Sequence, residues 1–385
     1  MIPEKDNPLR GLRALGQSVW LDFLGRSLLD SGELGGLVRE DGVSGVTSNP
    51  AIFEKAIGGS RDYDEAIARL AAEGKSPAEI YETLTVEDVQ RAANILQPVY
   101  ISSGGRDGFV SLEVSPHLAS DTEGTVAEAR RLWSELARPN VFIKIPATME
   151  GLPAIRRCIA EGINVNVTLL FGLPRYRKVA EAYVDGLQDR AAKGGRLDNV
   201  ASVASFFLSR IDTLVDPMLV KIAKEAGPYA KQARALVGQT AIASAKVAYT
   251  IHKEIFTGER FRKLVACGAR PQKLLWASTS TKNPAYSDVK YVEPIIGPDT
   301  INTLPLETIV AYRDHGHPVL TLPGGTEEAG RAMRQLAEVG IEIDAVTAQL
   351  EREGVQKFIQ PYDSLLETLR KKCEMLHAAP VSAGR

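Results

Sequence analysis

Short apolar runs bounded by Gly, Pro and Asn alternate along the chain with longer amphipathic stretches. The short runs are typical of strands, and their alternation with helical patterns favours a parallel sheet built of βα units. The expected strands are SVWLDF (18–23), GVSGVTSN (42–49), GFVSLEVS (108–115), VFIKIPA (141–147), GINVNVTLLF (162–171), NVASVASFFL (199–208), KLLWAST (273–279) and TINTLP (300–305). Eight parallel strands close a (β/α)8 TIM barrel, which is the fold that the sequence predicts.

Two stretches exceed a minimal barrel. Residues 211–266 carry a long helical pattern between the sixth and seventh strands, and residues 307–377 are also helical in character. We predict a single barrel domain over residues 1–377, with 211–266 as a helical insertion and 307–377 as C-terminal helices. The small, polar tail at 378–385 is predicted to be disordered.

Composition narrows the class of protein. The 385 residues are 44% hydrophobic and 24% charged, which is ordinary for a globular protein. The 46 Lys and Arg nearly balance the 48 Asp and Glu, so net charge supports neither nucleic-acid nor membrane-surface binding. The three widely spaced cysteines predict reduced thiols. Without a secretory pattern or an apolar run of roughly 20 residues, a cytoplasmic location is expected.

Lys144 is a basic residue in the middle of the apolar strand VFIKIPA. An ammonium group among Val, Phe and Ile is unfavourable unless it is paired or neutralised. A lysine kept as a neutral amine, with a pKa of roughly 7–8 in catalytic sites, most often attacks a carbonyl to form a Schiff base. We therefore predict a nucleophile here. The alternative is a strand-end lysine that extends its ammonium group into solvent.

Other polar side chains fall at the ends of the expected strands, where barrels build their active sites. Glu113 is predicted to be a general acid/base, with Thr168 helping to hold a water beside the reacting carbon. The alternative for Glu113 is a structural ion pair, for example with Lys144. Asp22 is predicted to take a proton from a substrate hydroxyl or to serve in carbon–carbon cleavage. Its alternative is a helix N-cap.

An anion site is predicted after the later strands, from Ser205, Arg210, Ser280 and Lys282. The two cations supply charge, and hydroxyl groups and helix N-termini donate hydrogen bonds. The alternative for Arg210 is an ion pair with Asp212 or Asp216. Asn49 and Asn166 could hold substrate hydroxyls, although each alone is more often a turn residue.

Further motifs carry no function. The five histidines lack HExxH or His–carboxylate spacing, so no metal site is expected. His315 and His317 are interpreted as residues at a helix end. LPGGTEEAG (322–330) lacks the spacing of a phosphate-binding loop and is interpreted as a turn that opens a helix.

Several long blocks resemble transaldolase, specifically its longer bacterial form (type 2), over roughly residues 10–375. The blocks are GVTSNPAIF (45–53), SLEVSPHLASDTEGT (111–125), VFIKIPATMEGLPAI (141–155), GINVNVTLLF (162–171), SFFLSRID (205–212) and WASTSTKNPAYSD (276–288). The resemblance implies a barrel of the class I aldolase type without metal or cofactor. It implies transfer of a dihydroxyacetone unit from fructose 6-phosphate or sedoheptulose 7-phosphate to erythrose 4-phosphate or glyceraldehyde 3-phosphate, in the non-oxidative pentose phosphate pathway.

The resemblance also implies residue roles. Lys144 falls on the Schiff-base lysine, Asp22 on the acid/base of carbon–carbon cleavage, and Glu113 with Thr168 on the pair that positions water. The implied substrate-binding residues are Asn49, Asn166, Ser205, Phe207, Arg210, Ser280 and Lys282. Lys282 stands where many members have arginine, and it keeps the charge but loses the bidentate fork.

Two other functions stay open at this point. The short fructose 6-phosphate aldolases release dihydroxyacetone instead of transferring it, and they carry Gln and Tyr where this chain has Glu113 and Phe207. A non-catalytic sugar-phosphate binder on the same barrel is the second alternative. It would not need the chemistry of Lys144, Glu113, Thr168 and Asp22, all of which this chain has.

Overall fold

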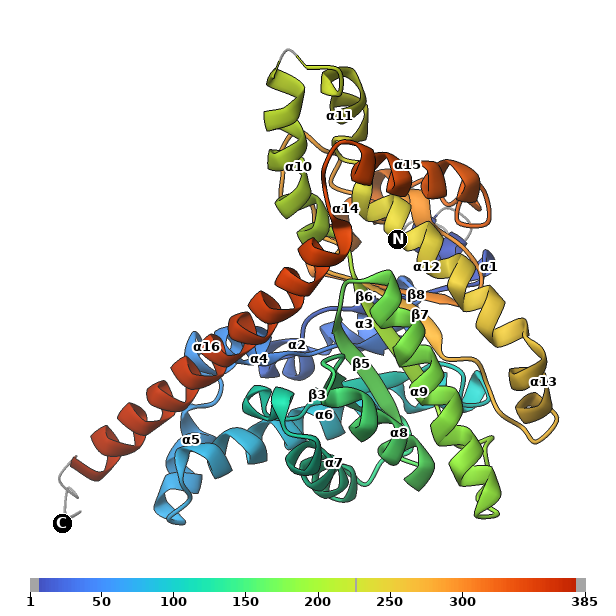
Figure 1. Ribbon diagram of the computed structural model, residues 1–385. Helices are drawn as coiled ribbons and strands as arrows, with labels where there is room; N and C mark the ends of the chain where they lie inside the picture. The colour runs from blue at the N-terminus through green and yellow to red at the C-terminus, as the bar shows by residue number, and fades with distance from the viewer. Residues whose placement is uncertain (1–6, 226, 379–385) are drawn as a thin grey trace, which may run out of the picture.

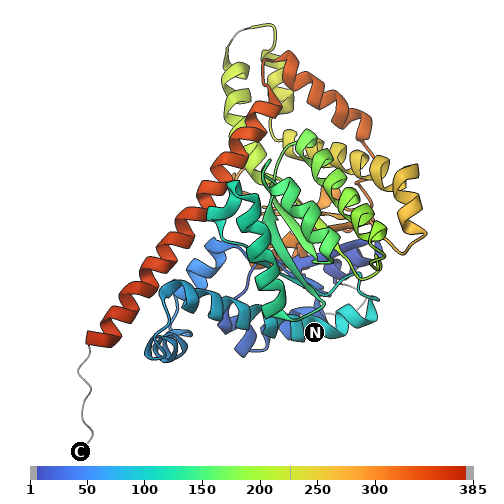
Figure 2. The ribbon, with the colours of Figure 1, turned by 60° about the horizontal axis from the view of Figure 1, so that its bottom comes forward.

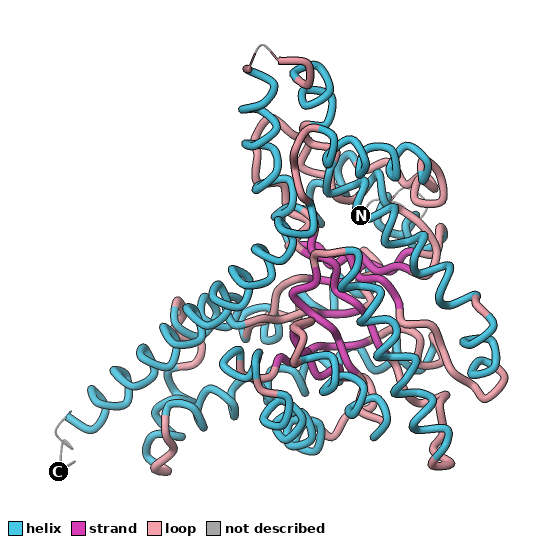
Figure 3. Tube along the Cα trace, viewed as in Figure 1, coloured by secondary structure: helices cyan, strands magenta, loops and turns pink. Residues whose placement is uncertain are grey.

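The computed structural model describes residues 7–225 and 227–378. At its centre lies a parallel sheet, drawn in magenta in Figure 3, with every predicted strand present. The strands are β1 Gln17–Leu21, β2 Gly45–Val46, β3 Phe109–Glu113, β4 Val141–Pro146, β5 Val165–Leu170, β6 Ser202–Phe207, β7 Lys273–Ala277 and β8 Thr300–Leu304. They pair in sequence order and β8 returns to β1, so the sheet is a closed barrel and the predicted fold is confirmed.

The strand register aligns the predicted catalytic positions. Glu113 at the end of β3 is the partner of Lys144 on β4, and Lys144 is in turn the partner of Asn166 on β5. In a parallel barrel, alternate residues point inward. Three neighbouring strands therefore present one row of polar side chains to the interior near the C-terminal ends of the strands, while Ile143 and Ile145 pack outward against the helices.

Helices surround the barrel (Figures 1 and 2). Before β6 they are α1 Pro8–Ala14, α2 Arg26–Asp30, α3 Glu33–Glu40, α4 Pro50–Phe53, the π-helical turn η1 Glu54–Gly58, α5 Asp64–Ala72, α6 Pro77–Ser102, the 3₁₀ turn η2 Pro116–Ser120, α7 Thr122–Leu136, α8 Gly151–Glu161 and α9 Leu173–Ala192. Local signals fix several of their starts. In α6, for example, Ser76 and Glu79 form a reciprocal capping box.

The two predicted additions are helical. Between β6 and β7 lie α10 Ser209–Lys224, α11 Ala230–Leu236, α12 Thr240–Thr257 and α13 Glu259–Val265. After β7 come the 3₁₀ turn η3 Glu293–Ile295 and, beyond β8, α14 Leu306–His315, α15 Thr326–Glu338 and α16 Ile343–Ala378. His315 ends α14, and residues 322–325 precede α15, as the sequence indicates. Of the predicted disordered tail, Ala378 ends α16, and the remainder lies outside the described residues.

The long helix α16 crosses the C-terminal side of the barrel. In Figure 1 it runs as a red diagonal from α10 past α4 toward α5, and it contacts α4, η1, α5, α6, η2 and α10. Its apolar side is buried, with Leu350, Phe358 and Leu365 among the core residues. This path brings a segment from the end of the chain over the mouth formed by the early strands. None of the helices in the described ranges combines the length and hydrophobicity of a membrane span.

Gly45 on β2 is required by the packing inside the barrel. A Cβ atom there would lie 2.4 Å from the ring of Trp20, which is fully buried and donates through Nε1 to Asp107 at 2.8 Å. We expect Gly45→Ala to lower the free energy of unfolding by about 1–3 kcal/mol, as overpacking does. Gly36→Ala in α3 is the matched control, because a Cβ atom added at Gly36 would have no neighbouring atom within 4 Å. Urea unfolding of both variants checks this, and equal losses would contradict it.

Candidate active site

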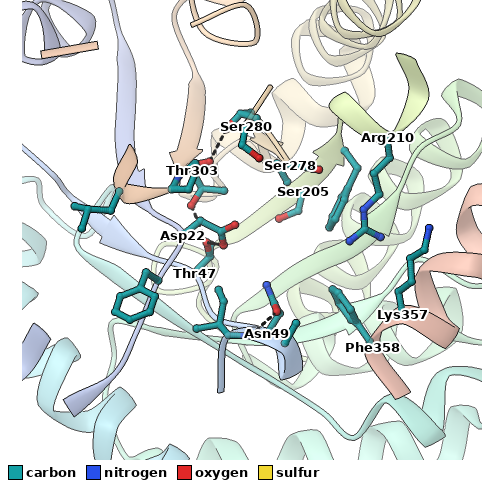
Figure 4. Close-up of a pocket in the computed structure, with 18 of the residues that line it drawn as sticks. Asp22, Thr47, Asn49, Ser205, Arg210, Ser278, Ser280, Thr303, Lys357 and Phe358 are labelled. Atoms are coloured by element: carbon teal, nitrogen blue, oxygen red, sulfur yellow. Dashed lines mark hydrogen bonds between the residues drawn. The ribbon is translucent and has the colours of Figure 1, made fainter. Parts of the chain in front are cut away.

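A cavity of about 470 Å³ opens at the C-terminal end of the barrel (Figure 4). We call it the barrel cavity. Its wall includes seven of the predicted site residues, Asp22, Asn49, Lys144, Ser205, Phe207, Arg210 and Ser280, together with Lys282 at its rim. Side chains contributed by strands and loops far apart in sequence thus meet at one site. Glu113, Asn166 and Thr168 are not part of the wall that the described residues form.

Lys144 is 4% exposed and sits between the barrel cavity and Glu113. Its Nζ donates to the carbonyl oxygen of Ser48 at 3.0 Å and lies 3.5 Å from Oε2 of Glu113. The ring of Phe358 covers the amine from α16, with its centroid 5.7 Å from Nζ. The side chain is therefore enclosed, and the predicted alternative of a lysine extending into solvent is wrong.

Glu113 on β3 is paired in register with Lys144, and Thr168 lies on β5, where it is paired with Pro146. Burial raises the pKa of Glu113 to about 7, and the nearby charge of Lys144 opposes that rise. Neither Glu113 oxygen nor the Thr168 hydroxyl has a hydrogen-bond partner among the described residues. A carboxyl with a pKa near neutrality can both give and take protons, which is what a general acid/base needs. The predicted ion pair with Lys144 is also present. The observed position of Glu113 therefore fits both a general acid/base and a structural ion pair.

Asp22 follows β1 and is held by threonines. Thr47 donates to its Oδ1 at 2.7 Å, and the Thr47 hydroxyl lies 2.7 Å from that of Thr303 (Figure 4). Burial raises the pKa of Asp22, opposed by the charge of Lys144 and the hydrogen bond from Thr47. The next helix, α2, begins after Gly25, so the interpretation of Asp22 as a helix N-cap is wrong.

Hydrogen bonds hold the predicted hydroxyl-binding residues Ser205, Asn166 and Asn49 in place in two different ways. Ser205 donates to Oδ1 of Asn166 at 2.7 Å, and Nδ2 of Asn166 donates to Ser111 at 3.0 Å. This chain across three strands fixes the Ser205 side chain beside the cavity. Asn49 is the N-cap of α4, since its Oδ1 accepts from the backbone of Ile52 at 3.1 Å. Its amide Nδ2 is the group left to donate to a ligand.

The two cations of the predicted anion site, Arg210 and Lys282, both line the barrel cavity. Arg210 is the second residue of α10 and lies over the ring of Phe207, with 5.4 Å between its Cζ and the centroid. Burial lowers the pKa of its guanidinium, and the charge of Asp22 opposes this. Its Nη1 is buried without a hydrogen-bond partner among the described residues. Lys282 is exposed and donates to Ser280.

The two carboxylates close to Arg210 in sequence, Asp212 and Asp216, bind other residues. Asp212 accepts from Tyr291 at 2.9 Å and pairs with Lys290 at 3.0 Å, while Asp216 accepts from Tyr286 at 2.7 Å. An ion pair of Arg210 with either aspartate is therefore not what holds it. Instead, these contacts fasten the segment between β7 and η3, which carries Ser280 and Lys282, against α10.

Several residues of the cavity wall were not predicted, namely Thr47, Ser278, Thr303, Lys357 and Phe358. Thr47 had a usable signal, because it alternates with Gly45 and Asn49 in GVTSN and so shares their inward face. Lys357 and Phe358 had none, since a Lys-Phe pair in an amphipathic helix is ordinary. Their place depends on the path of α16 across the barrel.

Comparisons with known proteins identify the family of the chain. A family model described as Transaldolase/Fructose-6-phosphate aldolase matches residues 19–369. The chain is 48% identical over 374 residues to a transaldolase of Trichodesmium erythraeum, covering 96% of this chain and 98% of that one. It is 49% identical over 360 residues to a transaldolase of Thiobacillus denitrificans, covering 94% and 99%.

A protein of Nostoc sp. named Transaldolase 2 is 47% identical over 375 residues, covering 96% of this chain and 98% of its own. These relatives match along nearly their whole lengths, which are those of the longer form. The chain therefore belongs to the longer form of the transaldolase family and is an enzyme of that family.

Proposed function

We propose that this transaldolase carries a dihydroxyacetone unit on a Schiff base at Lys144. The donor would be fructose 6-phosphate or sedoheptulose 7-phosphate, and the acceptor erythrose 4-phosphate or glyceraldehyde 3-phosphate. The observation that carries the proposal is the enclosed amine of Lys144, which faces the barrel cavity on one side and lies 3.5 Å from the Glu113 carboxyl on the other. An amine in this position can attack a ketone while the neighbouring carboxyl group donates and accepts the protons of the reaction.

The cavity supplies groups for the remaining steps. Asp22, oriented by Thr47, would accept the proton of the substrate hydroxyl as the carbon–carbon bond breaks. Glu113 and Thr168 would hold the water that Schiff-base formation releases and hydrolysis consumes. Asn49, Ser205 and Asn166 would bind or position hydroxyl groups, with Phe207 packing beside them, and no cofactor is invoked. Placement in the non-oxidative pentose phosphate pathway and in the cytoplasm belongs to the same proposal.

The acceptor decides between transfer and release. We expect fructose 6-phosphate alone to give little free dihydroxyacetone, and added erythrose 4-phosphate to start turnover to sedoheptulose 7-phosphate. Product analysis with and without acceptor measures this. Rapid release of dihydroxyacetone without acceptor would instead assign the chain to the aldolase activity that the family description also contains.

Arg210 is proposed to bind the phosphate together with Ser280 and Lys282, which line the same cavity. Arg210→Ala should raise the KM for phosphorylated substrates roughly 10- to 100-fold, the effect of losing charge-assisted hydrogen bonds worth about 1.5–3 kcal/mol. The change should fall mainly on KM because the phosphate is bound alike in ground and transition states. Steady-state kinetics test this against Arg177→Ala, which removes a partly exposed arginine paired with Glu254. An unchanged KM would move the phosphate site elsewhere.

A further inference from the structure

Glu113 lies in a wall between two cavities. On its inner side is Lys144, which lines the barrel cavity. On its outer side is a second cavity of about 650 Å³, to which Glu113 itself contributes. We call this the outer cavity. Its wall is made by α6, the end of β3, α7 and α16, through residues that include Tyr81, Ser115, Glu128 and Tyr362.

The outer cavity has the chemistry of a water-holding space. Ser115 donates its backbone N–H to Glu128 at 3.3 Å, and the rings of Tyr81 and Tyr362 meet edge to face at 5.1 Å. Carboxylate, hydroxyl and backbone groups thus alternate with apolar surface. Polar cavities of this size hold water, whereas wholly apolar ones stay dry. Glu113 and Tyr81 both line this cavity.

The reaction needs water at this carboxyl. Formation of the Schiff base joins the lysine nitrogen to the ketone carbon and expels the carbonyl oxygen with two protons as one water. Hydrolysis reverses this: the oxygen of an incoming water becomes the ketone oxygen, and its two hydrogens end on the lysine nitrogen. During both events the sugar occupies the barrel cavity. Because Glu113 and Thr168 are absent from the wall of that cavity, water that reaches them from the substrate side must pass the bound sugar.

We propose that the outer cavity is the path by which water enters and leaves the Glu113 side of the Schiff base, from outside the barrel. This inference rests on the proposed function, since it assumes that the Schiff base forms on Lys144. In this proposal, substrate and water use different routes. Sugars enter and leave through the barrel cavity, and water moves between α6, α7 and α16. Residues of the outer cavity would thereby affect the rate of water exchange without touching the sugar.

The test fills the outer cavity from two walls and follows oxygen exchange. Ala78 on α6 and Ala127 on α7 both line this cavity and are exposed, so tryptophan there fills its mouth without replacing core residues. The variants are Ala78→Trp, Ala127→Trp and the double substitution. Ala337→Trp on the exposed side of α15 is the matched control. Each enzyme is incubated with fructose 6-phosphate in ¹⁸O-water, and mass spectrometry measures incorporation at C2.

We expect the double variant to slow enzyme-dependent ¹⁸O exchange several-fold, while Ala337→Trp exchanges like the parent. The amount of sugar trapped on the enzyme by borohydride at equilibrium should stay the same, because a narrowed water path changes rates in both directions equally. Exchange at the parental rate in the double variant, with circular dichroism confirming its fold, would overturn the inference. Failure of the parent enzyme to trap sugar would instead overturn the proposed function, so the two failures are distinguishable.

Discussion

Replacing Lys144 by methionine is expected to lower the rate of dihydroxyacetone transfer by roughly 10⁴-fold or more, the scale seen when a covalent nucleophile is removed. Methionine keeps the length of the side chain and most of its packing but has no amine to attack the ketone. The fold should survive. Loss of one partner from a buried ion pair is normally costly, but the remaining Glu113 can become neutral, since burial raises its pKa to about 7.

Activity assays on the Lys144→Met enzyme measure the loss of rate, and circular dichroism on the same samples measures whether the fold is retained. Lys178→Met is the control, because Lys178 lies on the exposed side of α9, away from the barrel cavity. It should keep parental activity. A Lys144→Met enzyme that still turns over at more than a small fraction of the parental rate would show that covalent capture is not the mechanism.

Glu113→Gln is expected to give the second largest loss, roughly 10²- to 10⁴-fold in kcat, the usual contribution of general acid–base catalysis. Glutamine preserves the shape of the side chain beside Lys144 but cannot exchange a proton. Glu351→Gln is the matched control. Glu351 is a half-buried acid on α16 that pairs with Arg175 at 3.4 Å, and its pKa is also raised by burial. Steady-state kinetics should show a large loss only for Glu113→Gln.

The effect of Glu113→Gln on the rate of Schiff-base formation should depend on pH in one direction. Schiff-base formation requires an acid to protonate the departing hydroxyl, and Glu113 is an acid only below its pKa of about 7. The advantage of the parent over Glu113→Gln in the rate of Schiff-base formation should therefore be full below pH 7 and shrink as the pH rises through that value. Rapid borohydride quenching across the pH range measures the ratio of the two rates. A ratio independent of pH would remove Glu113 from this proton transfer.

Much of the fold was predictable because its signals are local. Each strand shows as an apolar run, and the (β/α)8 count then determines the closure. β2 illustrates the limit: the run GVSGVTSN predicts eight residues, but only Gly45–Val46 pair as a strand, and Asn49 at the end of the run already caps α4. The division of the chain into one domain of residues 1–377 stays a prediction.

The site was predictable where strand position alone determines direction. Lys144, Glu113 and Asn166 share a row because parallel register places them so. What the sequence could not supply depends on packing between distant segments. The cover over Lys144 comes from Phe358 near the end of the chain, and the support of the Lys282 segment comes from Asp212 and Asp216 on α10. The outer cavity behind Glu113 exists only because α6, α7 and α16 converge there.

Borohydride trapping followed by peptide mapping tests the central claim most directly. The enzyme is mixed with fructose 6-phosphate, reduced, digested and analysed by mass spectrometry. We predict a reduced three-carbon adduct on the peptide that contains Lys144, formed only with substrate and abolished in Lys144→Met. An adduct on another lysine, or active enzyme that traps no sugar on any residue, would contradict the account.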